Sequence, residues 1–132
     1  QWFITLKGNT MRLTKIIFSA LVGVAALAGA AFAHVSLKST NISAGAVIET
    51  LPETFAIAFS QPVGLAAFTL ETGKGAPVVL DYAPPKGMHA EFSIPLPRLA
   101  PGVYLAKWRT ISKDGHAMAG EAQFTLAEPK AP

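Results

Sequence analysis

Three residues of this chain could bind a metal ion together: His34, Asp114 and His116. His34 directly follows Ala31-Phe32-Ala33, a tripeptide with small residues at both ends that is typical of signal-peptidase cleavage. Cleavage there would make His34 the first residue of the mature chain, so that it offers both a free α-amine and an imidazole. Asp114 and His116 add a carboxylate and a second imidazole. This set of nitrogen and oxygen donors suits a square-planar Cu(II) ion, and the sequence therefore predicts one copper site.

Asp114 and His116 are two residues apart, on either side of Gly115, at the end of an expected strand. Side chains at positions i and i+2 of an extended chain point the same way, so both could reach one ion. The other interpretation is an ordinary Asp-Gly hairpin turn with an exposed histidine beside it. The terminal amine of His34 favours the metal site, because an α-amine has a pKa of about 7.7 and a divalent ion can displace its proton near neutral pH.

The segment before His34 has the composition of an export signal. Residues 1–10 precede the first methionine, and we expect them not to be native. Residues 11–33 predict a signal peptide, with basic residues near the start, a continuous apolar stretch over 16–28 and small residues before the cut. An uncleaved anchor is the alternative, because the 18 residues 16–33 are just long enough to span a bilayer. Cleavage predicts a periplasmic protein with no membrane anchor.

The charge balance of the expected mature chain argues against several kinds of partner. Three of the eleven Lys and Arg residues precede His34, which leaves eight against eight Asp and Glu residues and no formal net charge. Neither nucleic acid nor an anionic membrane is expected to attract such a chain. The sequence contains no cysteine, so we expect neither a disulfide framework nor a lipid attached through cysteine.

Short apolar runs separated by Gly and Pro clusters predict one all-β domain over residues 34–127, followed by a flexible tail at 128–132. The fold class that we expect is a single Greek-key β-barrel or sandwich of about seven strands, cupredoxin-like or immunoglobulin-like. No convincing helical period occurs in this part of the sequence. The expected strands are 34–39, 54–60, 65–72, 76–82, 88–94, 103–112 and 117–126.

The stretch 108–120, Trp-Arg-Thr-Ile-Ser-Lys-Asp-Gly-His-Ala-Met-Ala-Gly, resembles the C-terminal signature of CopC-type periplasmic copper-binding proteins, W-R-x-(V/I)-S-x-D-x-H-x-x-x-G. The opening at 34–39, His-Val-Ser-Leu-Lys-Ser, is similar to their His-x-x-L-x-S start. The resemblance implies a seven-stranded Greek-key β-barrel that carries Cu(II) through its N-terminal His, an Asp and a second His. Those roles fall here on His34, Asp114 and His116. The resemblance also implies a CopD-type inner-membrane protein as a partner.

Soft metal donors are few in this chain. Some members of the family hold Cu(I) in a Met-rich loop, but the corresponding region, 71–82, has neither Met nor His. Met88 and His89 lie in the next expected strand, and Met118 follows His116 by two residues. We therefore expect a Cu(II) carrier or buffer in copper tolerance or supply, not an enzyme. The alternatives are a periplasmic Cu(I) chaperone of the His/Met type and a histidine-brace copper redox enzyme.

Overall fold

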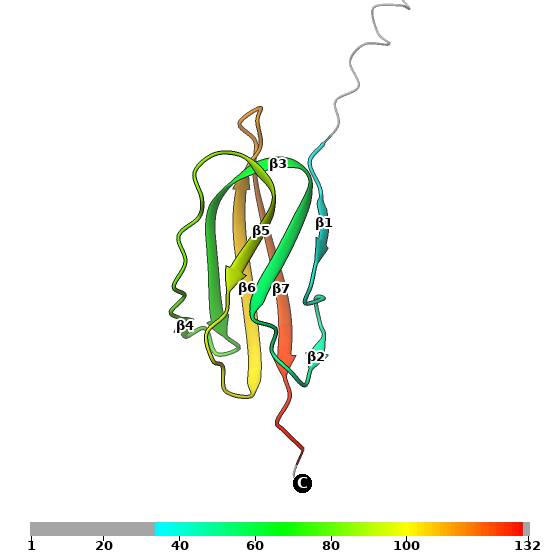
Figure 1. The fold of residues 1–132 in the computed structure, drawn as a ribbon, viewed down its shortest axis with the longest axis vertical. Helices are drawn as coiled ribbons and strands as arrows, with labels where there is room; N and C mark the ends of the chain where they lie inside the picture. Colours follow the sequence, from blue (N-terminus) through cyan, green and yellow to red (C-terminus); the bar gives the residue numbers. More distant parts are fainter. Residues whose placement is uncertain (1–33, 131–132) are drawn as a thin grey trace, which may run out of the picture. The chain divides into compact units, whose positions relative to one another are not determined.

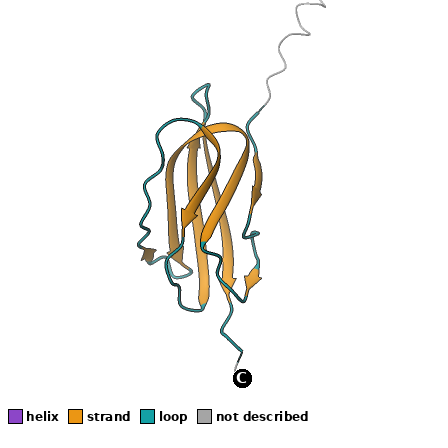
Figure 2. Ribbon diagram, in the orientation of Figure 1, coloured by secondary structure: helices purple, strands orange, loops and turns teal. Residues whose placement is uncertain are grey.

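The computed structural model describes residues 34–130, so the expected upstream segment (1–10) and signal peptide (11–33) lie outside the described residues. Residues 35–132 form a compact unit that is distinct from the segment ending at His34. The described part of the chain consists of strands and loops without a helix (Figure 2), and hence without a helix able to cross a membrane. The seven strands are β1 (Leu37–Thr40), β2 (Val47–Ile48), β3 (Thr54–Thr72), β4 (Pro77–Val78), β5 (His89–Pro95), β6 (Gly102–Ile111) and β7 (Ala117–Leu126).

The strands form two sheets that share the long strand β3 (Figure 1). The first half of β3 pairs antiparallel with β1 and β5, and its second half pairs antiparallel with β4 and β6. β7 lies beside β6, and β2 adds to β7 in parallel. β3 passes from the first sheet to the second between Val63, which pairs with His89, and Gly64, which pairs with Ile111. A strand that bends from one sheet into the next closes a corner of the sandwich.

The core lies between the two sheets and is built from alternate residues of the long strands. Phe55 packs on Phe68 with ring centroids 5.2 Å apart and on Trp108 with centroids 6.2 Å apart. These rings come from both halves of β3 and from β6, so aromatic contacts join the two sheets. The other buried apolar side chains are Ile42, Ile57, Phe59, Val63, Leu65, Leu70, Phe92, Ile94, Tyr104, Ala106, Ala122, Phe124 and Leu126.

The all-β sandwich predicted from the sequence is confirmed, while four of its elements differ. The expected strand 34–39 begins only at Leu37 and ends at Thr40, so residues 34–36 are not part of it. The expected strands 54–60 and 65–72 are one strand, because the chain between them bends without turning back. Only Pro77–Val78 of the expected strand 76–82 pairs, and the chain then continues as loop to β5. β2 was not predicted, and it consists of two residues that pair in parallel with the end of β7.

The hairpin of β6 and β7 is the element that carries two of the three expected donors, Asp114 and His116. Its ladder runs without interruption from Gly102 opposite Leu126 to Ile111 opposite Ala117. The turn 112–116 joins the two strands and projects from one end of the sandwich, at the top of Figure 1. The donors therefore stand on a short turn at the end of a regular ten-residue ladder.

Candidate metal centre

The turn between β6 and β7 is closed by hydrogen bonds between its own backbone groups. The N–H of Ser112 donates to the carbonyl oxygen of His116 at 2.9 Å, and the N–H of Gly115 donates to the carbonyl oxygen of Ser112 at 2.9 Å. Gly115 has φ of +88°, a left-handed conformation that glycine adopts without steric cost. The glycine thus allows the chain to reverse within five residues and to return His116 to the side of Asp114.

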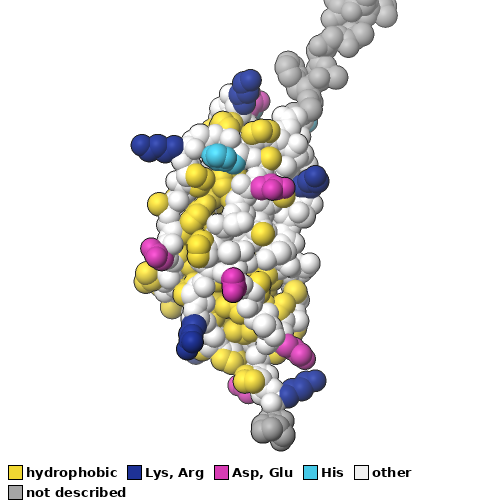
Figure 3. Space-filling model, viewed as in Figure 1, with side chains coloured by type: hydrophobic (Ala, Val, Ile, Leu, Met, Phe, Trp, Pro, Cys, Tyr) yellow, Lys and Arg dark blue, Asp and Glu magenta, His cyan; other side chains and the backbone are white. Residues whose placement is uncertain are grey.

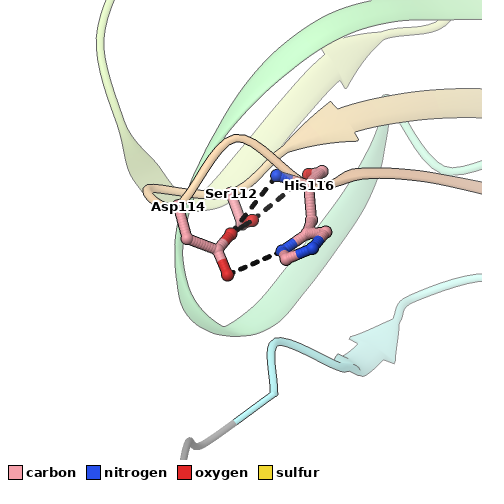
Figure 4. A network of polar contacts seen from close by, with 3 residues as sticks. All are labelled: Ser112, Asp114 and His116. Carbon is pink, nitrogen blue, oxygen red and sulfur yellow. Dashed lines mark hydrogen bonds and ion pairs between the residues drawn. The ribbon is translucent and has the colours of Figure 1, made fainter.

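The carboxylate of Asp114 accepts three hydrogen bonds within this turn (Figure 4). The hydroxyl of Ser112 and the backbone N–H of His116 both approach Oδ1, the N–H at 3.2 Å. Oδ2 lies 2.7 Å from Nδ1 of the His116 ring. The hydrogen bond from Ser112, followed by those from the His116 ring and backbone, lowers the pKa of Asp114 from 3.8 to about 2. The carboxylate is therefore anionic at any pH near neutral.

The two donor atoms are hydrogen-bonded to each other, at a separation that two ligands of one ion can also have. Two ligands bound at about 2.0 Å from one ion and at a right angle to each other stand about 2.8 Å apart. Oδ2 of Asp114 and Nδ1 of His116, at 2.7 Å, already have nearly this spacing. Both side chains face solvent, with 65 % of Asp114 and 82 % of His116 exposed. An ion can thus reach the pair from solution without any opening of the fold.

The structure brings Asp114 and His116 together, and their pairing with His34 stays a prediction. His34 is exposed at the start of the described residues and belongs to the N-terminal segment, whereas the turn belongs to the β domain. Among residues 34–130 no group of three or more His, Asp or Glu side chains gathers as a metal site. The turn on its own thus supplies one nitrogen and one oxygen donor.

The other candidate donors occupy different surroundings. Met88, 43 % exposed, lies just before β5, with its sulfur close to Gly64. His89 is exposed, and its Nε2 is 3.1 Å from the carbonyl oxygen of Lys86, while its ring packs edge-on against Phe92. Met118 is half-buried in β7. The hydrogen bond and the ring contact of His89 thus both involve residues within three positions of it in the sequence.

A pocket of about 320 Å³ lies between the start of β1 and the β6–β7 hairpin. Ser36 lines one side of it, and Trp108, Thr110 and Met118 line another. Thr110 is fully buried, and its hydroxyl is the one buried side-chain polar group without a hydrogen-bond partner in the described chain. The pocket shows that the chain entering β1 runs beside the ends of β6 and β7 that carry the turn.

Ser112 belongs to this site, although no function was predicted for it. The sequence signal was available, because a serine or threonine near an Asp-Gly turn often bonds to the groups of that turn. In the structure the hydroxyl of Ser112 donates to Oδ1 of Asp114, and the carbonyl oxygen of His116, at 3.2 Å, is the more distant acceptor beside it.

The family model of the CopC domain matches residues 37–127 of this chain. The chain belongs to the CopC family. The match covers all seven strands and includes Asp114 and His116, and it begins three residues after His34. The comparison with curated proteins gave no match.

Solved structures of CopC-family proteins share this fold. CopC from Methylosinus trichosporium OB3b superposes with a TM-score of 0.62 at 26 % sequence identity, over 75 % of this chain and 98 % of that one. PcoC from Escherichia coli, described as a methionine-rich copper resistance protein, gives a TM-score of 0.56 at 28 % identity, over 71 % of this chain and 99 % of that one. The CopC domain of this chain thus corresponds to nearly the whole length of both proteins.

Proposed function

We propose that this protein is a copper-binding protein of copper resistance or supply that carries one Cu(II) ion in the periplasm. The ligands in this proposal are the α-amine and imidazole of His34, the carboxylate of Asp114 and the imidazole of His116. The proposal includes export by residues 11–33 and cleavage before His34. Membership of the CopC family and the copper resistance function of PcoC support the choice of metal.

The Asp114–His116 pair is the observation that carries the proposal. Its oxygen and nitrogen are 2.7 Å apart, it is open to solvent, and its carboxylate is anionic far below neutral pH. An anionic oxygen and an imidazole nitrogen are ligands that divalent copper accepts readily. A further amine and imidazole from one residue would complete four ligands in a plane.

The course of the chain into β1 supports His34 as the source of those remaining ligands. Ser36, two residues after His34, lines a pocket together with Thr110 and Met118. Thr110 pairs with Met118 in the β6–β7 ladder. The next pair, Ile111 with Ala117, is the last one before the turn. Only one residue lies between His34 and Ser36, and Ser36 lines the pocket beside the hairpin.

The ligand set favours a carrier over a redox enzyme. An anionic carboxylate stabilises Cu(II) more than Cu(I), so it opposes cycling between the two states. On the face shown in Figure 3, acidic and basic side chains are scattered, so this face has no concentration of one charge that would steer a charged substrate. If the copper-loaded protein oxidised ascorbate with formation of peroxide at many turnovers per ion, the redox enzyme would become the better interpretation.

Titration of the exported protein with Cu(II), followed by EPR, tests the proposal. We expect a tetragonal spectrum with nitrogen coupling at one equivalent, and no intense thiolate band because the chain has no cysteine. The double variant His34→Ala/His116→Ala should lose this spectrum. His89→Ala is the matched control, because His89 is an exposed histidine whose ring bonds only locally, and it should bind as the unaltered protein does. Equal binding by the double variant would exclude the proposed ligands.

A further inference from the structure

The two carboxylate oxygens of Asp114 have different surroundings in the turn. Oδ1 receives the hydroxyl of Ser112 and the backbone N–H of His116. Oδ2 receives only the ring nitrogen of His116, at 2.7 Å. Figure 4 shows these contacts converging on one carboxylate, with Ser112 at one oxygen and the imidazole at the other.

The two donors on Oδ1 leave it poorly suited to bind an ion. A carboxylate oxygen has two lone pairs in its plane, and two hydrogen bonds occupy both of them. Oδ2 keeps lone-pair capacity and is the oxygen that points toward the imidazole. A carboxylate without such constraints can instead bind one ion through both oxygens, which takes up two coordination positions.

We propose, on the basis of the copper site described above, that Ser112 is a positioning residue of this site: its hydroxyl holds Oδ1 of Asp114, so that Oδ2 alone is presented to the ion. The carboxylate then takes one position in the coordination plane, and the remaining positions stay free for nitrogen ligands. Ser112 acts through Asp114 and does not itself contact the metal.

The attachment of Ser112 to the fold explains how it can hold a side chain on an exposed turn. Its N–H donates to the carbonyl oxygen of His116 at 2.9 Å, and its carbonyl oxygen accepts the N–H of Gly115 at 2.9 Å. It directly follows Ile111, the last residue of β6, and is half-buried. The backbone of Ser112 is thus part of the closed end of the hairpin, and only its hydroxyl serves the carboxylate.

The test compares Ser112→Ala, Ser112→Thr and Lys113→Ala in protein recovered after export of the full chain, with the N-terminus checked by mass spectrometry. The probe is Cu(II) alone, measured by competition with a Cu(II) chelator and by EPR. Loss of a hydrogen bond that orients a metal ligand costs about tenfold to a hundredfold in affinity. We expect Ser112→Ala to lose about tenfold and to show an altered EPR spectrum, because Oδ1 becomes free to bind the ion. Ser112→Thr keeps a hydroxyl and should restore both the affinity and the spectrum.

Lys113→Ala is the matched control, since Lys113 is an exposed residue of the same turn, and it should leave both measurements unchanged. Thermal unfolding of the metal-free variants shows whether the turn still forms. Unaltered affinity and spectrum in Ser112→Ala, or failure of Ser112→Thr to restore them, would overturn the inference. If the unaltered protein bound no Cu(II), the proposed function would fail and this inference with it. If the unaltered protein bound Cu(II) and Ser112→Ala bound it equally well with the same spectrum, only this inference would fail.

Discussion

Asp114 is exposed and yet has a fixed orientation, because the groups that bind it belong to its own turn. Its three hydrogen bonds come from Ser112 and His116, two residues before and two residues after it. Hydrogen bonds to an ionised carboxylate are stronger than those between neutral groups. A single anionic side chain thus links the two ends of the turn, and the same contacts that shape the turn prepare an oxygen ligand.

The lowered pKa of Asp114 predicts how the metal-free protein responds to acid. The pKa is about 2 in the folded chain against 3.8 ordinarily, so the folded state binds this proton less readily than the unfolded state does. The stabilising contribution of Asp114 is therefore complete above pH 4 and is lost as the pH falls toward 2. Urea unfolding of the metal-free protein and of Asp114→Asn should differ at pH 6, and the difference should disappear by about pH 2. A constant difference across this range would show that the carboxylate charge contributes nothing.

At the scale of elements, the β6–β7 ladder depends on one close contact between Trp108 and Gly120, which are opposite each other in the register. A methyl group on Gly120 would come within 2.4 Å of Nε1 of Trp108, which is far closer than atoms can pack. The indole ring therefore lies directly over the glycine, and the absence of a side chain there lets Trp108 remain in the core with Phe55.

We expect Gly120→Ala to destabilise the protein by about 1–3 kcal/mol, the usual cost of overpacking a core. Chemical unfolding monitored by tryptophan fluorescence measures the change, and the emission of Trp108 should shift as its ring is displaced. Ala119→Ser, a change at the exposed neighbouring position, is the control and should leave stability nearly unchanged. Unchanged stability of Gly120→Ala would mean that the ring moves aside at no cost.

The elements predicted well from the sequence are those whose pattern is local. Short apolar runs between Gly and Pro clusters predicted β6 and β7, and the Asp-Gly sequence predicted the turn between them. β2 could not be predicted, because two residues become a strand only through parallel pairing with a segment nearly eighty positions away. The continuity of β3 was missed for a related reason: Pro62 and Gly64 are typical of turns, but here they lie in a strand that changes sheets.

The sequence likewise predicted only part of the candidate site. Residue types and spacing predicted Asp114 and His116 as metal ligands. In the structure their side chains are in contact at 2.7 Å, and metal binding by them stays a prediction. The contribution of Ser112 was not foreseen, because it depends on how the closed turn directs a hydroxyl onto one particular oxygen. Spacing along a sequence shows which residues can be neighbours, while only the folded backbone shows which atoms are bonded.

At the scale of the whole molecule, the β domain and the N-terminal residue have separate tasks. The core of the domain lies between the two sheets, and the first described residues, from His34 to Ser36, precede its first strand. A change before His34 should therefore leave the fold unaffected. The proposed site, in contrast, needs the α-amine that only cleavage before His34 provides.

A variant with one glycine added before His34 tests the stability of the fold and the binding of copper separately. In the extended chain the nitrogen of His34 is part of a peptide bond, and its lone pair is delocalised into that bond. This nitrogen therefore no longer acts as an amine ligand. We expect the extended protein to unfold at the same temperature as the mature one in the absence of metal. Its affinity for Cu(II), by chelator competition, should fall by more than about tenfold, because loss of a ligand should cost at least as much as loss of a group that only orients one. Affinity should also decrease with acid in the mature form, as the nitrogen ligands take up protons, while Asp114 stays ionised down to about pH 2. Equal Cu(II) affinities of the two forms would remove the amine from the site and leave Asp114 with two imidazoles as the only ligands.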